Sequence, residues 1–269
     1  MIDAAPLWLV GIALFAAMGL AYEGGLRLHP LLRSRADAPR NESGADAPRN
    51  ESGDESNILS GVLGLLALLM AFAFSLSLDR YEERRALVVS EATAIDTLDT
   101  RLALLPETDR TALASDLARY ARARVVFGRA SNPARSARAM VRAEALHDQL
   151  GNRLYAVIAA GPMDARTTLL AQAFDEVGDI AVARRAARAA RLPPPVLALL
   201  ALYCIVGAAM LGYSVAGSKA KHWLAAGMFF MLLSVAFVTI LDLDLPRGGA
   251  ITVSQIELER VAKALATRL

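Results

Sequence analysis

Four long apolar segments divide the chain. None of them contains a charged residue, and each has about 20 residues, the length that crosses a bilayer core of about 30 Å. The predicted spans are Ala4–Tyr22, Ile58–Leu78, Val196–Ala216 and Trp223–Leu241. Buried helices of a large soluble core are less favoured, because such a core rarely supplies four separate uncharged stretches of this length. The pattern therefore predicts a multi-pass membrane protein.

The first span could instead be a cleaved signal peptide. Asp3 precedes it without any Lys or Arg, and no A-x-A-like cleavage site follows it, so we expect a retained span. The membrane orientation stays open. Lys219 and Lys221 favour one orientation, and the arginines at the two ends of the long middle segment favour the other.

The middle segment, residues 79–194, has apolar residues at helical spacing. The clearest stripe starts after the second span and contains Val88, Ala92, Ile95, Leu98 and Leu102. Breaks are expected at Pro106, at Ser131–Pro133 and at Gly161–Pro162. Because no alternating strand pattern of useful length occurs, we predict an all-α fold: four transmembrane helices with an extramembrane helical bundle.

Two long helices are expected to be shared between the membrane and soluble parts. Nothing breaks the helix from Ile58 to Leu105, and an Arg-rich helix leads toward the third span, with a kink or break at Pro193–Pro195. Residues 36–44 and 45–53 repeat the sequence ADAPRNESG, which is too polar to fold and predicts a flexible loop. Near the C-terminus, Leu258, Val261 and Leu265 give an amphipathic helix that should pack on the bundle or on a neighbouring subunit.

These elements predict a division of the chain into six parts. The parts are 1–26, the first span; 27–57, the flexible loop; 58–78, the second span; 79–194, the helical extramembrane domain; 195–241, the third and fourth spans; and 242–269, the C-terminal tail.

Composition agrees with this segregation and excludes several functions. Hydrophobic residues make up 55% of the chain and charged residues 21%, with a mean hydropathy of +0.38. A net charge of +2 gives no reason to expect nucleic acid. Cys204, the single cysteine, lies in an apolar span and is expected to be a packing residue, and the histidines His29, His147 and His222 are expected on the surface. Without a phosphate-binding loop, metal-ligand spacing or a nucleophile motif, we expect no enzyme, no cofactor and no metal site.

Small residues recur every three or four positions on one face of the second span. They are Ser60, Gly64, Ala67, Ala71, Ser75 and, just beyond the span, Asp79. Spacing alone favours close helix packing, as small residues provide in membranes. The alternative is a narrow pore lining, with Phe72 or Phe74 as an apolar constriction and Arg80, Arg84 and Arg85 as charges at its mouth.

A second polar cluster follows the fourth span in the run ILDLDLPRGGAITVSQ. Asp242 and Asp244 could bind a cation or pair with nearby arginines, although acidic residues at a span end are more often simply solvated. Pro246 and Gly249 belong to a turn that returns the chain toward the bundle.

The second span and its continuation, ESNILSGVLGLLALLMAFAFSLSLDRYEERRALVVSEATAI, resemble the core of the bacterial bestrophin-like family, and so does the run after the fourth span. The resemblance implies a homo-oligomer, a pentamer as in bestrophins proper, that conducts small anions such as chloride through a pore lined by the second span. Asp242 and Asp244 would fall near the bestrophin Ca²⁺ segment, but two acids replace a dense acidic run there, so calcium gating is not expected.

Two functions compete at this point. The first is a homo-oligomeric, bestrophin-like anion channel in the inner membrane of a bacterium, surrounded by lipid. The second is a non-conducting sensor or scaffold whose helical domain binds a partner protein.

Overall fold

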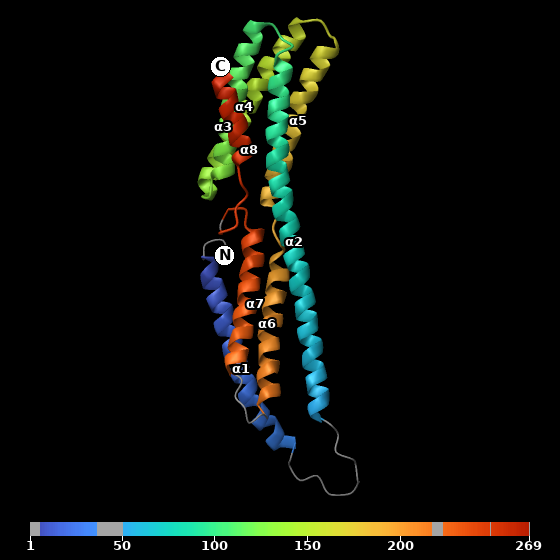
Figure 1. Cartoon of the computed structure of the whole chain (residues 1–269), viewed down its shortest axis with the longest axis vertical. Helices are drawn as coiled ribbons and strands as arrows, with labels where there is room; N and C mark the ends of the chain where they lie inside the picture. Colours follow the sequence, from blue (N-terminus) through green and yellow to red (C-terminus); the bar gives the residue numbers. More distant parts are fainter. Residues whose placement is uncertain (1–5, 37–50, 217–222, 248, 269) are drawn as a thin grey trace. The chain divides into compact units, whose positions relative to one another are not determined.

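The structure is a computed structural model that describes residues 6–36, 51–216, 223–247 and 249–268. Eight helices account for most of these residues, and no strand occurs among them. The helices are α1 (Leu7–Ala36), α2 (Glu51–Leu102), α3 (Glu107–Arg129), α4 (Pro133–Ala160), α5 (Ala165–Ala189), α6 (Pro194–Val215), α7 (Trp223–Asp244) and α8 (Ile256–Arg268) (Figure 1). The prediction of an all-α fold is confirmed.

Over the described residues, each of the four expected spans corresponds to a helical stretch that is long and apolar enough to cross a membrane. α1 is longer than the first expected span, since it continues to Ala36. Pro30 lies inside this helix. α2 begins at Glu51, so the predicted loop 27–57 is partly helical at both of its ends. Most of the tandem nonapeptide, residues 37–50, lies outside the described residues.

The chain divides into two compact units. The membrane unit comprises Met1–Leu78 and Arg191–Leu245, and the helical unit comprises Asp79–Ala190 and Pro246–Leu269. Residues 246–269 of the predicted C-terminal tail therefore group with the middle segment, and residues 242–245 group with the membrane unit. α2 contributes residues to both units without a break in the helix, as its uninterrupted pattern predicted.

Two glycines allow α1 and α6 of the membrane unit to touch backbone to backbone. A Cβ at Gly25 would lie 2.0 Å from the carbonyl oxygen of Ala209, and a Cβ at Gly212 would lie 2.1 Å from that of Tyr22. Small residues let membrane helices approach this closely. α1 also lies against α7 (Figure 1), and Cys204 is completely buried in the core of the unit, which confirms its predicted packing role.

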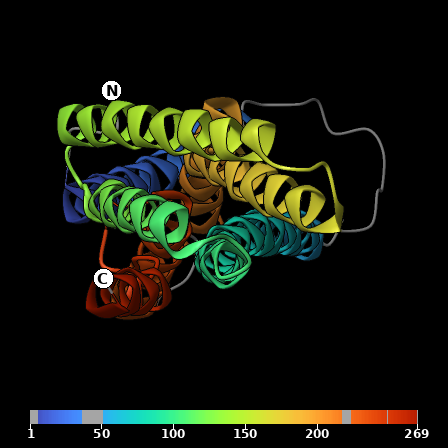
Figure 2. The same cartoon turned by 90° about the horizontal axis from the view of Figure 1, so that it is seen from above.

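The helical unit has one apolar core built from the predicted stripes. Its fully buried members include Ile95 and Leu98 of α2, Leu113 and Leu117 of α3, Leu150 and Leu154 of α4, and Leu170 and Val177 of α5. α8 packs on α3 through Leu258, Ala262 and Leu265 (Figure 1, Figure 2). The amphipathic C-terminal helix therefore packs on the bundle of its own chain.

The helix ends follow the expected breaks. Pro106 precedes α3 and Pro193 precedes α6, positions at which the missing proline N–H is tolerated. The side chain of Asn132 accepts hydrogen bonds from Ala134 N at 2.8 Å and Arg135 N at 3.4 Å, so it caps α4. Asp164 caps α5 in the same way and forms a capping box with Thr167.

Candidate functional site

The α2 segment of the membrane unit has one face buried in its own chain. Leu66, Met70, Ala73 and Ser77 recur every three or four residues on this face and are buried. The three apolar side chains belong to the core that α1, α6 and α7 share. This stripe fixes which side of α2 faces the rest of the membrane unit.

The small-residue face predicted from the sequence is exposed. At about 100° of rotation per residue, Gly64 and Ala71 lie on the side of α2 opposite Ala73. The exposed residues on and beside this face are Ser60, Gly64, Ala67, Ala71, Phe72, Phe74, Ser75 and Asp79. A Cβ at Gly64 would meet no atom within 4 Å. Within the part of the chain that the structure describes, the small residues of this face therefore do not pack closely against another helix.

Two exposed phenylalanines flank this face. Phe72 is 61% exposed and Phe74 is 41% exposed, and helical geometry places them about 80° to either side of Gly64. Leu68, which is 53% exposed, lies between Gly64 and Phe72 on the helix surface. Leu68 is not a small residue and so does not belong to the predicted pattern, although its spacing of four from Gly64 and from Phe72 places it on the same side of the helix.

The three arginines after the span differ in environment. Arg85 is exposed and Arg80 is half-buried, whereas Arg84 is only 5% exposed. Arg84 lines a cavity of about 30 Å³ in the helical unit together with Arg184, Arg188 and Arg247. Only Arg80 and Arg85 therefore retain the exposure that a role at a pore mouth would require.

The two acidic residues after the fourth span are buried at the end of α7. Asp244 Oδ1 accepts a hydrogen bond from the backbone N–H of Leu192 at 2.9 Å, and Asp242 is also buried. The more usual interpretation of these acids as solvated is therefore wrong. Pro246 and Gly249 are half-buried in a turn-like segment after α7. Over the described residues, no group of three or more His, Cys, Asp or Glu side chains could hold a metal ion.

A buried carboxylate in the helical unit was not singled out from the sequence. Glu91 of α2 is fully buried and forms ion pairs with Arg124 of α3 and Arg184 of α5. Arg184 also donates a hydrogen bond to the side chain of Gln255. A Cβ at Gly128 would lie 2.1 Å from Gln255 Oε1, so a glycine is needed there for this contact. One carboxylate thus connects three helices.

More positive charge surrounds this carboxylate than it can balance. The guanidinium of Arg188 lies 4.7 Å from the ring centroid of Phe127 and donates to Phe127 O at 2.8 Å and Ala130 O at 2.6 Å. Burial and the neighbouring guanidinium of Arg247 lower the pKa of Arg188 to about 10, which keeps it charged at neutral pH. Arg124, Arg184 and Arg188 outnumber Glu91, so this cluster is cationic and suited to attract anions.

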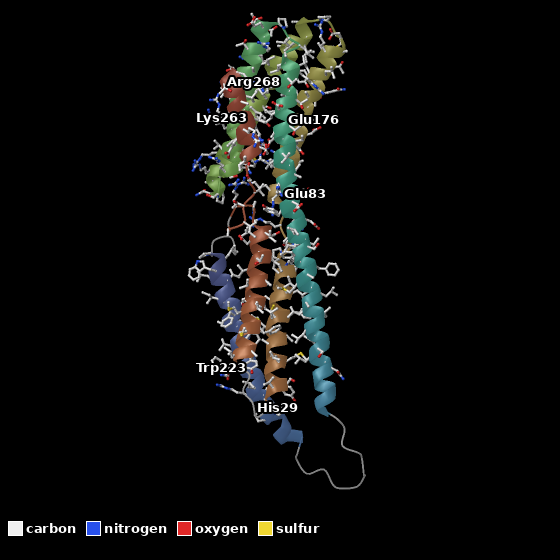
Figure 3. All side chains as sticks on the ribbon, in the orientation of Figure 1. His29, Glu83, Glu176, Trp223, Lys263 and Arg268 are labelled. Atoms are coloured by element: carbon white, nitrogen blue, oxygen red, sulfur yellow. The ribbon has the colours of Figure 1, made fainter. Side chains whose placement is uncertain are left out.

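His147 was expected on the surface, but it is half-buried. Its ring stacks on Phe174 with centroids 4.4 Å apart and lies 5.6 Å from the ring of Tyr120. Phe174 belongs to α5 and Tyr120 to α3. The polar residues next to His147 in the sequence therefore did not indicate its aromatic surroundings. His29 packs against Tyr213 at 5.2 Å, and Trp223 at the start of α7 is exposed (Figure 3). His222 lies outside the described residues.

These features define a helical membrane protein of the bestrophin type, with four apolar helices and a separate helical unit. The Bestrophin-like domain family matches residues 49–258, and the chain belongs to this family. No curated protein matches the sequence.

Solved structures of bacterial proteins share the fold. A single-substitution variant of a bestrophin homologue from Klebsiella pneumoniae has a TM-score of 0.70 at 15% identity, and the match covers 98% of each chain. A bestrophin homologue from the same organism, solved by zinc phasing, has a TM-score of 0.65 at 16% identity, covering 93% of this chain and 96% of its own. At such identities the similarity shows the fold.

Proposed function

We propose that the chain assembles with copies of itself into an anion channel in the bacterial inner membrane, with the exposed face of α2 lining the pore. A pentamer conducting chloride is the form that the bestrophin resemblance implies. Each copy would contribute one α2 face, and the remaining exposed apolar surface would contact lipid.

The exposure of the small-residue face is the observation that carries this proposal. Gly64 and Ala71 lie opposite the buried stripe of α2, so they are available to a central axis rather than to the chain's own core. Small side chains without charge leave space for a narrow conduit, and the rings of Phe72 and Phe74 beside them would form apolar constrictions. Leu68 is exposed on the same side and joins these residues as a pore candidate.

Charge supports the choice of an anion. Arg85 is exposed and Arg80 is half-buried just beyond the span, and exposed guanidinium groups raise the local concentration of small anions. The four apolar spans bounded from the sequence contain no charged residue, and the two acids that follow the fourth span, Asp242 and Asp244, are buried at the end of α7.

Flux measurements test the proposal. The purified protein is reconstituted into liposomes, and chloride efflux is compared with that of protein-free vesicles. We expect chloride flux above this background and an increase in Phe72→Ala or Phe74→Ala, because each removes a bulky ring. Leu232→Ala, which truncates an exposed apolar side chain of α7, is the matched control and should leave flux unchanged. Flux equal to that of empty vesicles in all variants would overturn the proposal.

A cysteine-labelling experiment separates a pore from a packing surface. Cys204 is fully buried, so a water-soluble, charged thiol reagent should react at Ala71→Cys but not with the parent protein. Labelling that blocks flux while the oligomer stays intact supports the pore. Absence of labelling together with loss of the oligomer in Ala71→Leu supports a scaffold that uses this face for packing.

A further inference from the structure

A cavity of about 180 Å³ lies between α3, α4 and α5 of the helical unit. α3 contributes Tyr120 and Arg124, α4 contributes His147, and α5 contributes Gly178. This cavity is separate from the pore face of α2, because it is formed by helices of the other unit.

Three polar atoms of the lining residues have no partner. Tyr120 Oη, Arg124 Nη2 and His147 Nε2 are buried and make no hydrogen bond to any residue that the structure describes. Tyr120 is 1% exposed and Arg124 is 3% exposed. Because buried polar groups in proteins are nearly always hydrogen-bonded, three unpartnered atoms around one cavity point to a polar occupant.

Arg124 is the buried one of the four charged residues that line the cavity, and Glu144, Asp148 and Arg185 are exposed. Arg124 uses Nε to bind Glu91, and the same carboxylate binds Arg184, so one negative charge faces two guanidinium groups. Glu144, at the exposed side, is paired with Arg185, and Asp148 is exposed. An occupant beside Arg124 therefore gains from one negative charge of its own.

The protonation states of the other two groups make them donors to such a charge. Burial raises the pKa of Tyr120, so its hydroxyl keeps its proton. Burial also lowers the pKa of His147, so the neutral imidazole carries one proton and can place it on Nε2.

The rest of the lining is apolar and small. Ala143, Ala181 and Val182 line the cavity, and position 178 is a glycine. A Cβ at Gly178 would lie 3.3 Å from both Cε1 and Nε2 of His147, so even one methyl group would narrow the cavity. A cavity of about 150 Å³ is known to accommodate benzene, and the volume here therefore suits a molecule of a few carbon atoms.

We propose that this cavity binds a small aliphatic monocarboxylate. Its carboxylate accepts hydrogen bonds from Arg124 Nη2, Tyr120 Oη and His147 Nε2, and its short chain lies against the alanines and Val182. The site goes beyond the proposed channel function, because it would exist whether or not the protein conducts ions.

Calorimetric titration of the full-length protein in detergent tests the site, with sodium propionate as the probe. Propionamide, which lacks the charge, and sodium chloride at equal ionic strength, which lacks the chain, are the comparison ligands. We expect saturable binding of propionate and no saturable binding of the other two. No binding of propionate, or equal binding of either comparison ligand, overturns the proposal.

Two conservative variants locate the site without removing the buried ion pair. Tyr120→Phe removes only the hydroxyl and should weaken propionate binding about tenfold, as expected for a lost hydrogen bond to a charged group. Gly178→Ala narrows the cavity and should also weaken binding. The control is Tyr155→Phe, which removes a hydroxyl that donates to Asp175 outside the cavity. Equal weakening in Tyr155→Phe, or unchanged affinity in both test variants, places binding elsewhere and contradicts the proposal.

Discussion

The side chain of Asp244, the last residue of α7, accepts a hydrogen bond from the backbone N–H of Leu192, two residues before α6 begins. The bond is 2.9 Å long and both residues are buried. It joins the exit of one membrane helix to the entrance of another, 52 residues apart in the sequence.

Asp244→Ala should lower the thermal stability of the purified protein. It leaves the buried N–H of Leu192 without this acceptor, which costs about 1–3 kcal/mol. Asp244→Asn keeps an acceptor oxygen and should lose less. The midpoint of thermal unfolding in detergent measures both, with Glu83→Gln at an exposed position of α2 as the control (Figure 3). Equal midpoints for Asp244→Ala and the parent protein would show that the bond contributes nothing.

Glu91→Gln should destabilise the helical unit strongly. It leaves the buried guanidinium groups of Arg124 and Arg184 without their counter-charge, and breaking a buried ion pair costs about 3–5 kcal/mol. The control is Glu144→Gln, since Glu144 and Arg185 form a pair that is about half exposed, and such surface pairs are worth less than about 1 kcal/mol. Chemical denaturation followed by circular dichroism compares the two variants. Similar losses of unfolding free energy would contradict the importance of burial.

Gly25→Ala should disrupt the contact of α1 with α6. The new methyl group would lie 2.0 Å from the Ala209 carbonyl oxygen, so the helices must separate, and overpacking of this kind costs about 1–3 kcal/mol. The adjacent Gly24→Ala is a matched control, because its Cβ would meet nothing within 4 Å. Thermal unfolding in detergent should distinguish the neighbours, and identical midpoints would argue against close helix contact at this position.

His147 should make stability depend on pH. Burial lowers its pKa in the folded state, so below the unfolded value of about 6.5 the unfolded chain binds a proton that the folded chain does not. Its contribution to stability is therefore present above that pH and is lost as the pH falls through 6.5 toward the folded pKa. Thermal midpoints at pH 7.5 and 5.0, in buffers free of carboxylic acids, should fall less on acidification in His147→Gln than in the parent protein. If the thermal midpoint falls by the same amount between pH 7.5 and 5.0 in both proteins, His147 is not the source of the pH dependence.

The sequence predicted those features that depend on residues close together in the chain. The spans follow from uninterrupted apolar composition, and Pro106 and Asn132 mark the helix ends at which the structure has them. The outward position of Gly64 could not be predicted, because the spacing that places small residues on one face does not say which face the core covers. The buried stripe at Leu66 and Met70 decides this only in the folded unit.

Contacts between distant residues had no signal in a single sequence. Glu91 and Arg184 are 93 positions apart, and nothing in the pattern around either one distinguishes it from the other charged residues of the segment. His147 was misassigned for the same reason, since the rings of Tyr120 and Phe174 that cover it come from other helices. The resemblance to a family supplied the fold but not these contacts.

The shared carboxylate of Glu91 also restricts how this protein can diverge. Because two arginines on two different helices depend on one acid, Glu91 cannot be replaced by an apolar residue alone without leaving two buried charges, whereas loss of either arginine leaves Glu91 paired with the other. A relative that lacks the acid should have exchanged both arginines as well. In homologous sequences, a buried arginine at either position should therefore occur only together with the acid.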